Sequence, residues 1–331
     1  MRQISSHTPG PPSSLVLENA QEPVPVSGEV LIRVAAAGLN FADALMINDQ
    51  YQVRHERPFA PGIEVAGVIE TIGPAVTRFN VGDRVAAILP VGGFAEFAIA
   101  PAETCYAIPR TMPFEIAAAS LVTYGTVYHA LKRQADLRSG ETLLALGCGG
   151  GVGMASVDIG SALGAFVVAG GSSKEKVEAV CVLGAEKGFV YADPTDKAAA
   201  IAFTKELRSL CPTGGWDVAS DPVGGAFVAP VMRAAQWQSR YLVLGFPAGI
   251  PSVPLNLALV NAASIIGVFW GEAVKRDPAA AAVDMASLYA LWEEGKIAPR
   301  PPEIVALPDV PDAIARLHSR SVVGKIVAVM H

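Results

Sequence analysis

Charged residues are scarce in this chain of 331 residues, and no segment concentrates positive charge. They make up 17% of the sequence, and 25 Lys and Arg against 31 Asp and Glu give a formal net charge of −6. Nucleic acids and anionic membrane surfaces are bound by clustered positive charge, which no run of Lys or Arg supplies here. We therefore expect neither of these partners, whereas a small anionic ligand, bound locally, remains open.

A membrane-spanning run is also missing, although 51% of the residues are apolar. The stretch 241–271 contains no charged residue, but Pro247, Pro251 and Pro254 interrupt it, and the remainder falls short of the roughly 20 apolar residues that a span needs. The first residues, MRQISSHTPGPPSS, lack the apolar block of a signal peptide. The sequence therefore predicts a cytoplasmic protein.

Cysteine and histidine are few. The four cysteines are far apart and include no Cys-x-x-Cys pair, so they are interpreted as reduced core residues rather than as a disulfide framework or a zinc knuckle. The five histidines show no spacing typical of metal ligands. No metal site is predicted.

What the sequence does contain is a change of pattern near residue 122. Before it, short β-type runs cut by Gly and Pro, such as 29–36 and 64–72, predict a compact, barrel-like β domain. From 123 on, apolar runs alternate with helical stretches, which is typical of a parallel sheet with helices on both faces. Periodicity leaves open whether the elements after about residue 264 extend this sheet or return to the first domain.

A glycine-rich loop follows the apolar run at 143–147. Gly147, Gly150 and Gly153 give the spacing G-x-x-G-x-x-G, ahead of a helix that begins near Met154. Glycines let the backbone approach a pyrophosphate, whose charge is stabilised by the free N–H groups and the dipole of the helix start. This strand–loop–helix context favours dinucleotide binding over a glycine-rich turn that binds nothing.

The end of the next strand-like run indicates which dinucleotide binds. NAD-binding domains place an Asp or Glu there, about 20 residues on, to bond the ribose 2′-hydroxyl. This chain instead has Ser172, Ser173, Lys174 and Lys176, whose hydroxyl and ammonium groups suit a 2′-phosphate. The alternative is a serine-capped helix start with solvated lysines. We favour NADPH, against which only Glu175 argues.

Blocks along nearly the whole chain resemble the zinc-independent medium-chain dehydrogenases/reductases, in the NADPH:quinone oxidoreductase group that includes zeta-crystallin-like proteins. They include GLNFADALMINDQYQV (38–53), PFAPGIEVAGVI (58–69), TYGTVYHAL (123–131), DPVGG (221–225) and GVFWGE (267–272). The resemblance implies an α/β fold with a Rossmann doubly wound parallel sheet and a GroES-like β-rich catalytic domain. It also implies a homodimer through the Rossmann domain.

The same resemblance divides the chain into three segments. Residues 1–122 would form the first part of the GroES-like catalytic domain, 123–263 the Rossmann dinucleotide-binding domain, and 264–331 the return to the catalytic domain. Zinc-dependent relatives have Cys where this chain has Asn40, and Gly-His-Glu where it has Ile63 between Gly and Glu. Isoleucine cannot ligate a metal and an amide is a poor zinc ligand, so an alcohol dehydrogenase is disfavoured.

The resemblance also assigns site residues. Tyr51 and Asn40 would be catalytic, beside the nicotinamide and the acceptor, with Tyr51 as the hydrogen-bond donor to developing negative charge. The cofactor-binding residues would be Asn40, Thr126, Gly150, Gly151, Val152, Ser173, Lys176, Tyr191, Phe246, Phe269, Gly271, Arg320 and Lys325. Phe246 and Phe269 could instead be core aromatics, Arg320 a solvated charge, and Asp43 and Glu64 are interpreted as structural carboxylates.

The expected activity is therefore hydride transfer from NADPH to a small-molecule quinone or another conjugated, α,β-unsaturated carbonyl acceptor, without a metal. One alternative is a crystallin-type structural or regulatory protein that binds NADPH with little turnover. An alcohol dehydrogenase is the other.

Overall fold

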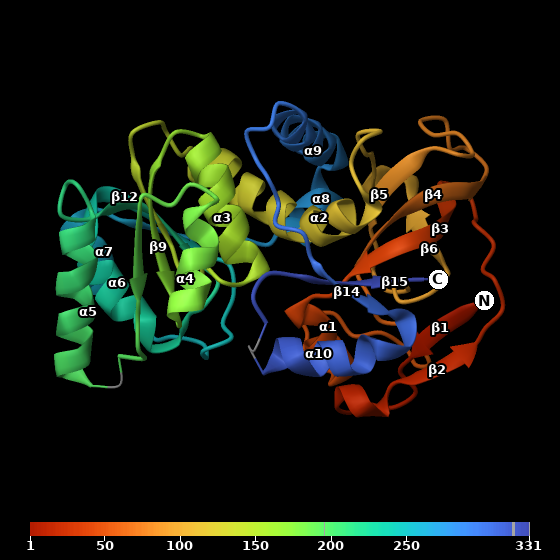
Figure 1. Ribbon diagram of the computed structural model, residues 1–331, viewed down its shortest axis with the longest axis horizontal. Coiled ribbons are helices and arrows are strands. Elements are labelled where there is room, and N and C mark those ends of the chain that lie inside the picture. Colours follow the sequence, from red (N-terminus) through yellow and green to blue (C-terminus); the bar gives the residue numbers. More distant parts are fainter. Residues whose placement is uncertain (195, 320–321, 331) are drawn as a thin grey trace. The chain divides into compact units, whose positions relative to one another are not determined.

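The computed structural model describes residues 1–194, 196–319 and 322–330, which fall into two compact units (Figure 1). The bounds of the units are Met1–Val122, Ala273–Tyr289 and Arg300–His331 for unit 1, and Thr123–Glu272 and Ala290–Pro299 for unit 2. The domain boundaries after residues 122 and 263 stay a prediction. Arg320, a predicted cofactor residue, lies outside the described residues.

Unit 1 is built on a mainly antiparallel sheet of seven strands, in the order β14-β15-β3-β4-β5-β7, with β6 paired to β3. The strands of this sheet are β3 (Glu29–Gly38), β4 (Glu64–Ile72), β5 (Arg84–Ile88), β6 (Phe97–Pro101), β7 (Cys105–Ala107), β14 (Glu303–Ala306) and β15 (Ile326–Val329). The antiparallel pairing of β15 with β3 joins the last strand of the chain to an early one, and Figure 1 shows the two side by side. The two strands after residue 300 therefore belong to this sheet.

Several smaller elements complete unit 1. They are the antiparallel pair β1 (Arg2–Ser5) and β2 (Val16–Asn19), helices α1 (Phe41–Ile47) and α10 (Val310–His318), and the 3-10 turns Pro12–Ser14, Ala102–Thr104 and Leu307–Asp309. Fully buried side chains of β3 to β6, with Phe94, form its core, and Ile314 of α10 belongs to the same cluster. Burial of this apolar surface is what holds segments distant in sequence together.

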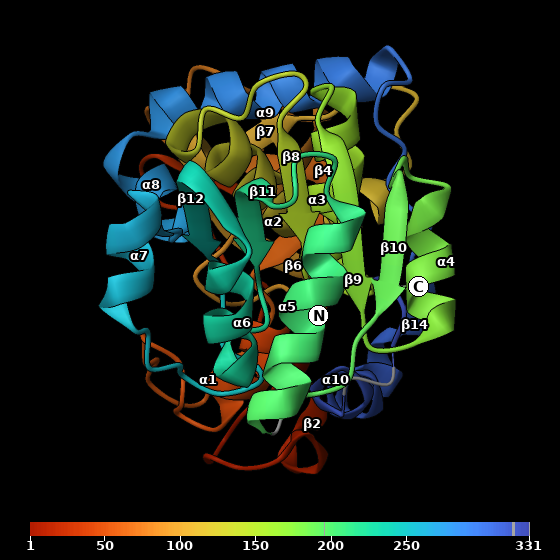
Figure 2. The same ribbon diagram turned by 90° about the vertical axis from the view of Figure 1, so that its left-hand side faces the viewer.

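Unit 2 contains a six-stranded sheet in which every neighbouring pair is parallel, in the order β10-β9-β8-β11-β12-β13 (Figure 2). Its strands are β8 (Thr142–Ala145), β9 (Phe166–Gly171), β10 (Lys187–Val190), β11 (Trp216–Asp221), β12 (Ala235–Val243) and β13 (Ser264–Gly267). The prediction of a doubly wound parallel sheet is confirmed. The run at 264–267, whose placement the periodicity left open, extends this sheet.

Helices cover both faces of the parallel sheet. Figure 1 shows α3 (Gly151–Ala162) and α4 (Lys174–Cys181) on one face, and α5 (Lys197–Leu210), α6 (Val228–Arg233) and α7 (Leu255–Asn261) on the other. The remaining helices are α2 (Phe114–Tyr128), α8 (Trp270–Arg276) and α9 (Pro278–Glu293), with a π-helical turn at His129–Gln134 and a 3-10 turn at Gly225–Phe227. Because helices cover both faces, the central strands β8 and β9 are short, almost entirely apolar and buried. None of the helices in the described ranges has the length and hydrophobicity of a membrane span.

Candidate functional site

Apart from Thr126, which lies in helix α2, the predicted cofactor residues of unit 2 follow the carboxyl ends of the parallel strands, at one end of the sheet. In open α/β sheets, ligands bind at this end, where strand order reverses, and here β8 lies between β9 and β11. Following the sheet order, the residues are Tyr191 after β10, Ser173 and Lys176 after β9, Gly150, Gly151 and Val152 after β8, Phe246 after β12, and Phe269 and Gly271 after β13. Their contacts with a cofactor stay a prediction.

The glycine loop has the geometry of a phosphate-binding helix start. Gly147 has a φ of 58°. Gly150 caps α3 without a side chain, which leaves the first N–H groups of the helix available to an anion. A Cβ on Gly153 would lie 2.2 Å from the carbonyl oxygen of Gly147, so only glycine permits this close approach.

Tyr191 supports this loop through a hydrogen bond. Its hydroxyl oxygen accepts the N–H of Gly147 at 3.2 Å, and its ring contacts Phe227 at 4.8 Å between centroids. Burial raises the pKa of the Tyr191 hydroxyl, so the group is neutral. The hydrogen bond to Gly147 is a role that the sequence did not predict for this residue.

In the segment after β9, one serine caps helix α4 and the other contacts the ammonium group of Lys176. Ser173 is the N-cap of α4 and accepts a hydrogen bond from the N–H of Lys176 at 3.3 Å, as the alternative interpretation of this segment expected. The Lys176 ammonium group donates to the hydroxyl of Ser172 at 3.3 Å, and its aliphatic stem packs against Gly149. Ser172 is thus the hydroxyl next to this ammonium group; the sequence pattern included it, whereas the residues assigned by resemblance did not.

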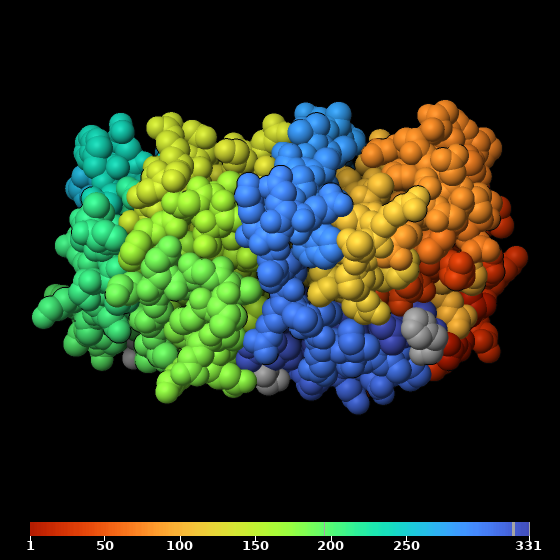
Figure 3. All heavy atoms as spheres, turned by 45° about the horizontal axis from the view of Figure 1, so that its top comes forward, coloured from red at the N-terminus to blue at the C-terminus, as the bar shows by residue number. Residues whose placement is uncertain are grey.

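Lys174 is oriented differently from Lys176. Its side chain is 84% exposed and pairs with Glu178 one helical turn on, at 3.4 Å. Figure 3 shows this part of the chain, in light green, at the molecular surface. Of the lysines in the segment, Lys176 is therefore the one directed back to the glycine loop.

Phe246 and Phe269 are surface aromatics at the ends of neighbouring strands. They are 43% and 49% exposed, which contradicts the alternative that they are core residues. A Cβ on Gly271 would meet only the Phe269 ring, at 3.8 Å. In α2, a Cβ on Gly125 would lie 2.3 Å from the ring of Trp270, so glycine lets this tryptophan pack against the helix. Exposed aromatic rings that follow the carboxyl ends of two strands suit contact with a flat ligand.

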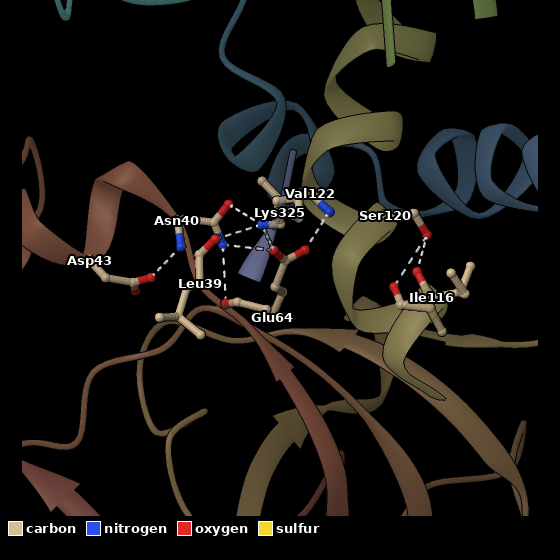
Figure 4. Close-up of polar contacts among 10 residues, drawn as sticks. Leu39, Asn40, Asp43, Glu64, Ile116, Ser120, Val122 and Lys325 are labelled. Carbon is tan, nitrogen blue, oxygen red and sulfur yellow. Dashed lines mark hydrogen bonds and ion pairs between the residues drawn. The ribbon is translucent and has the colours of Figure 1, made fainter. Parts of the chain in front are cut away.

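In unit 1, the buried Glu64 and the partly buried Asn40 and Lys325 form a polar cluster (Figure 4). The Lys325 ammonium group is 10% exposed and donates to Glu64 Oε1 at 2.5 Å, Asn40 Oδ1 at 2.9 Å and the carbonyl of Leu39 at 2.8 Å. Asn40 Nδ2 donates to the same Glu64 oxygen at 2.7 Å. Glu64 Oε2 accepts the N–H of Val122 at 2.8 Å.

This cluster fixes the orientation of the Asn40 amide. Its oxygen faces an ammonium donor and its nitrogen faces a carboxylate, so the two ends are not interchangeable. All three donors of Lys325 have partners within unit 1, and the cofactor contact assigned to Lys325 stays a prediction. Glu64 is a structural carboxylate, as expected. A Cβ on Gly38 would lie 2.4 Å from Glu64 Oε1, so the cluster also requires this glycine.

Asp43 lies next to this cluster and is fully buried (Figure 4). Its Oδ2 accepts the N–H of Asn40 at 2.7 Å, whereas Oδ1 has no hydrogen-bond partner in the described part of the chain. Burial raises the pKa of Asp43 to about 7. Burial, and secondly the charge of Asp43, raise the pKa of the Tyr51 hydroxyl. Tyr51 is therefore a neutral hydrogen-bond donor near a partly protonated carboxyl group.

Arg57 holds the loop that carries Tyr51. Its guanidinium group donates to Asp49 Oδ1 at 2.8 Å, to the carbonyl of Ile47 at 3.0 Å and to the hydroxyl of Ser6 at 3.2 Å. These contacts join both ends of the loop between α1 and residue 58. Sequence reasoning missed Arg57, because its partners become recognisable only from the folded loop.

The residues at the positions of zinc ligands are engaged in other ways. Asn40 is bound to Lys325 and Glu64, and Ile63 offers no donor atom. Within residues 1–194, 196–319 and 322–330, no group of three or more His, Cys, Asp and Glu side chains is arranged to hold a metal ion.

Two family models match the chain. The alcohol dehydrogenase GroES-like domain matches residues 26–110, and the zinc-binding dehydrogenase model matches residues 151–287. The quinone oxidoreductase-like protein 2 of Bos taurus is 34% identical over 315 residues, which cover 94% of this chain and 88% of the relative. The quinone oxidoreductase of Mus musculus is 33% identical over 84% of this chain and 82% of its own.

Solved structures resemble the whole chain. The quinone oxidoreductase of Thermus thermophilus, solved alone and with NADPH, has a TM-score of 0.82 and 31% identity, with full coverage of both chains. A mycobacterial protein solved in complex with NADPH has a TM-score of 0.91 and 28% identity, again with full coverage.

Proposed function

Because this chain belongs to the quinone oxidoreductase family of zinc-independent medium-chain dehydrogenases/reductases, we propose that it transfers hydride from NADPH to a quinone or another conjugated, α,β-unsaturated carbonyl acceptor, without a metal. Membership of the family rests on 34% identity over 94% of the chain and makes the protein an oxidoreductase. Two structural relatives were solved with NADPH, which supports the choice of cofactor.

The observation that carries the proposal is the order of chemical groups along the carboxyl edge of the parallel sheet. Ser172 and Lys176 suit a 2′-phosphate, the uncapped start of α3 suits a pyrophosphate, and the exposed Phe246 and Phe269 suit a nicotinamide ring. This order matches the order of groups in an extended NADPH molecule. The reduced nicotinamide, when bound, supplies the hydride.

Tyr51 is the proposed donor to the carbonyl oxygen of the acceptor. Its neutral hydroxyl can donate a hydrogen bond to the negative charge that develops on this oxygen. Asn40, whose amide is held by Glu64 and Lys325, is the second proposed polar contact. A strong acid is not required, because a quinone can take its protons from water.

A binding protein of crystallin type with little turnover is the second candidate function. The glycine loop and Lys176 would serve this function equally well, so turnover decides between the two. An alcohol dehydrogenase is disfavoured because Asn40 and Ile63 stand where zinc-dependent relatives have ligands.

The decisive experiment is NADPH oxidation with a panel of quinones and enones, in the presence and absence of a metal chelator. We expect turnover with at least one acceptor class and no effect of chelation. Tight NADPH binding without turnover on any acceptor would favour the binding protein. Activity that is lost on chelation and restored only by zinc would contradict the metal-free mechanism.

The assembly we propose is a homodimer through unit 2, in the cytoplasm. The homodimer is supported by β13, an edge strand of the parallel sheet that pairs only with β12 among the described strands.

A further inference from the structure

A buried carboxylate, Asp221, lies at the carboxyl end of β11, next to the glycine loop in the sheet order. Its Oδ1 accepts the N–H groups of Val223 at 2.6 Å and Gly224 at 3.0 Å. Its Oδ2 accepts a hydrogen bond from the hydroxyl of Tyr241 on β12, which is also buried. Three donors therefore converge on one carboxylate.

The loop that Asp221 holds, residues 222–225, contacts the glycine loop on one side. A Cβ on Gly147 would lie 2.9 Å from Val223 Cγ2 and 3.4 Å from the Pro222 ring. Both the positive φ of Gly147 and the closeness of Val223 therefore require glycine at this position. A shift of residues 222–225 would reach the first glycine of the pyrophosphate loop directly.

On its other side, the same loop holds the segment that carries Phe246. A Cβ on Gly224 would lie 3.0 Å from Phe246 Cδ1. The N–H of Ala248 donates to the carbonyl of Val223 at 2.9 Å, and the N–H of Gly225 donates to the carbonyl of Gly249 at 2.8 Å. Residues 222–225 therefore separate the glycine loop from the Phe246 segment and contact both.

We propose that Asp221 is a positioning residue for the cofactor, because it fixes residues 222–225 and thereby sets the spacing between the glycine loop and Phe246. The inference rests on the proposed function, in which these two features bind the pyrophosphate and the nicotinamide ring of NADPH. Asp221 itself need not touch the cofactor. Small errors in such spacing are costly, since a misplacement of about 1 Å can lower activity on the order of a hundredfold.

Two substitutions at this position separate geometry from charge. Asp221→Asn keeps the Oδ1 acceptor for both N–H groups, and its Nδ2 can donate to the Tyr241 oxygen. Asp221→Ala removes every acceptor and leaves three donors, two of them buried, without this partner. We therefore expect Asp221→Ala to raise the Kd for NADPH at least about tenfold, and Asp221→Asn to keep it within about threefold of the wild type.

Asp217 provides a matched control at the opposite end of the same strand. Its carboxylate is half-buried and accepts the N–H of Thr142 at 2.8 Å, away from the ligand edge. Asp217→Ala should lower Tm without changing the Kd for NADPH. Calorimetric titration of NADPH, thermal unfolding and steady-state kinetics of all three variants distinguish a positioning role from a purely structural one.

The outcomes are separable. A raised Kd in Asp221→Ala, restored in Asp221→Asn, supports the inference, whereas a lowered Tm with unchanged Kd in Asp221→Ala overturns it. If Asp221→Ala does not fold, Gly224→Ala tests the same loop, because the residue has a φ of 71° and its Cβ would lie 3.0 Å from both Phe246 Cδ1 and the carbonyl oxygen of Gly249; an unchanged Kd there overturns the inference. Failure of the wild type to bind NADPH would instead contradict the proposed function.

Discussion

Tyr51 carries the chemistry proposed for the acceptor, and removal of its hydroxyl tests this role. Tyr51→Phe should lower kcat/KM for the acceptor by roughly ten- to a hundredfold, or about 1.5–3 kcal/mol, because a hydrogen bond to developing charge is lost. The Kd for NADPH should change little. Steady-state kinetics with a quinone and an enone, together with titration of NADPH, measure both quantities.

Tyr106→Phe is the matched control for this substitution. Tyr106 lies in β7 of the same unit, and its buried hydroxyl has no hydrogen-bond partner in the described ranges. Loss of its oxygen should leave acceptor kinetics unchanged. Equal kcat/KM values for Tyr51→Phe and the wild type would show that the Tyr51 hydroxyl has no role in the reaction and that the residue serves only in packing.

We expect Lys176 to determine the preference of the protein for NADPH over NADH. Its ammonium group, together with the Ser172 hydroxyl, can donate charge-assisted hydrogen bonds to a 2′-phosphate. We expect the wild type to prefer NADPH over NADH by at least about tenfold, and Lys176→Glu to weaken NADPH binding far more than NADH binding. Calorimetric titration of both cofactors gives the ratio, which should shrink as the salt concentration rises.

Lys174→Glu makes the same charge change two residues away and serves as the control. Because Lys174 is directed to Glu178 and solvent, this variant should reduce the preference only slightly, by a long-range effect. The prediction would be wrong if the wild type bound NADPH and NADH equally.

The glycine loop and the segment after β9 show how much of the site can be predicted from individual residues. Residue type and spacing were sufficient to place the glycine loop between β8 and α3 and to single out Lys176, whose contact with a cofactor stays a prediction. They did not show that Ser173 is used as a helix cap and leaves Ser172 beside Lys176, since the assignment depends on where α4 begins. In the cluster, Lys325 lies 261 residues from Glu64 and 285 residues from Asn40 in the sequence, so no local pattern predicts it.

At the scale of elements, Asp158 joins three segments of unit 2. It lies in α3, accepts the Tyr124 hydroxyl of α2 at 2.8 Å, and accepts the N–H of Ala298 at 3.0 Å. Burial raises its pKa from 3.8 to about 6. Because the folded state binds this proton more tightly than the unfolded state, the group favours folding at low pH, and this contribution is lost as pH rises from about 4 to about 6.

Asp158→Asn should remove this pH dependence. The free energy of unfolding of the variant, relative to the wild type, should rise by about 2–3 kcal/mol between pH 4 and pH 6 and then stay constant. Urea unfolding at several pH values measures the difference. Asp136→Asn, at an exposed carboxylate paired with Arg138, is the control. A difference independent of pH would show that Asp158 titrates alike in both states.

Element type was largely predictable, because the parallel strands are short apolar runs and the helices follow them at regular spacing. The alternation of apolar runs and helical stretches expected from residue 123 on corresponds to strands β8 to β13 and helices α3 to α7. Sheet membership was less accessible. β13 extends the parallel sheet whereas β15 pairs with β3, and this difference depends on contacts across most of the chain rather than on local sequence.

At the scale of the whole molecule, β13 is an edge strand through which two copies of the chain can associate. It pairs with β12 on one side, and no described strand pairs with its other side. An open edge strand presents unpaired N–H and C=O groups, which natural proteins cover or pair. Around this edge, Leu255, Leu259 and Val260 of α7 and Ile265 of β13 expose apolar side chains. A second copy, related by a two-fold axis, would pair its β13 antiparallel to this one and cover both apolar patches.

We therefore expect the protein to sediment with twice the chain mass, and Leu259→Lys to weaken the dimer because it places a charge in the apolar contact. Val182→Lys is the control, since Val182 is similarly exposed but lies beyond α4 at the opposite side of the sheet order. Sedimentation equilibrium over a range of concentrations measures the association. A monomeric wild type would exclude pairing at β13, and a Leu259→Lys dimer as tight as the wild type would place the interface elsewhere.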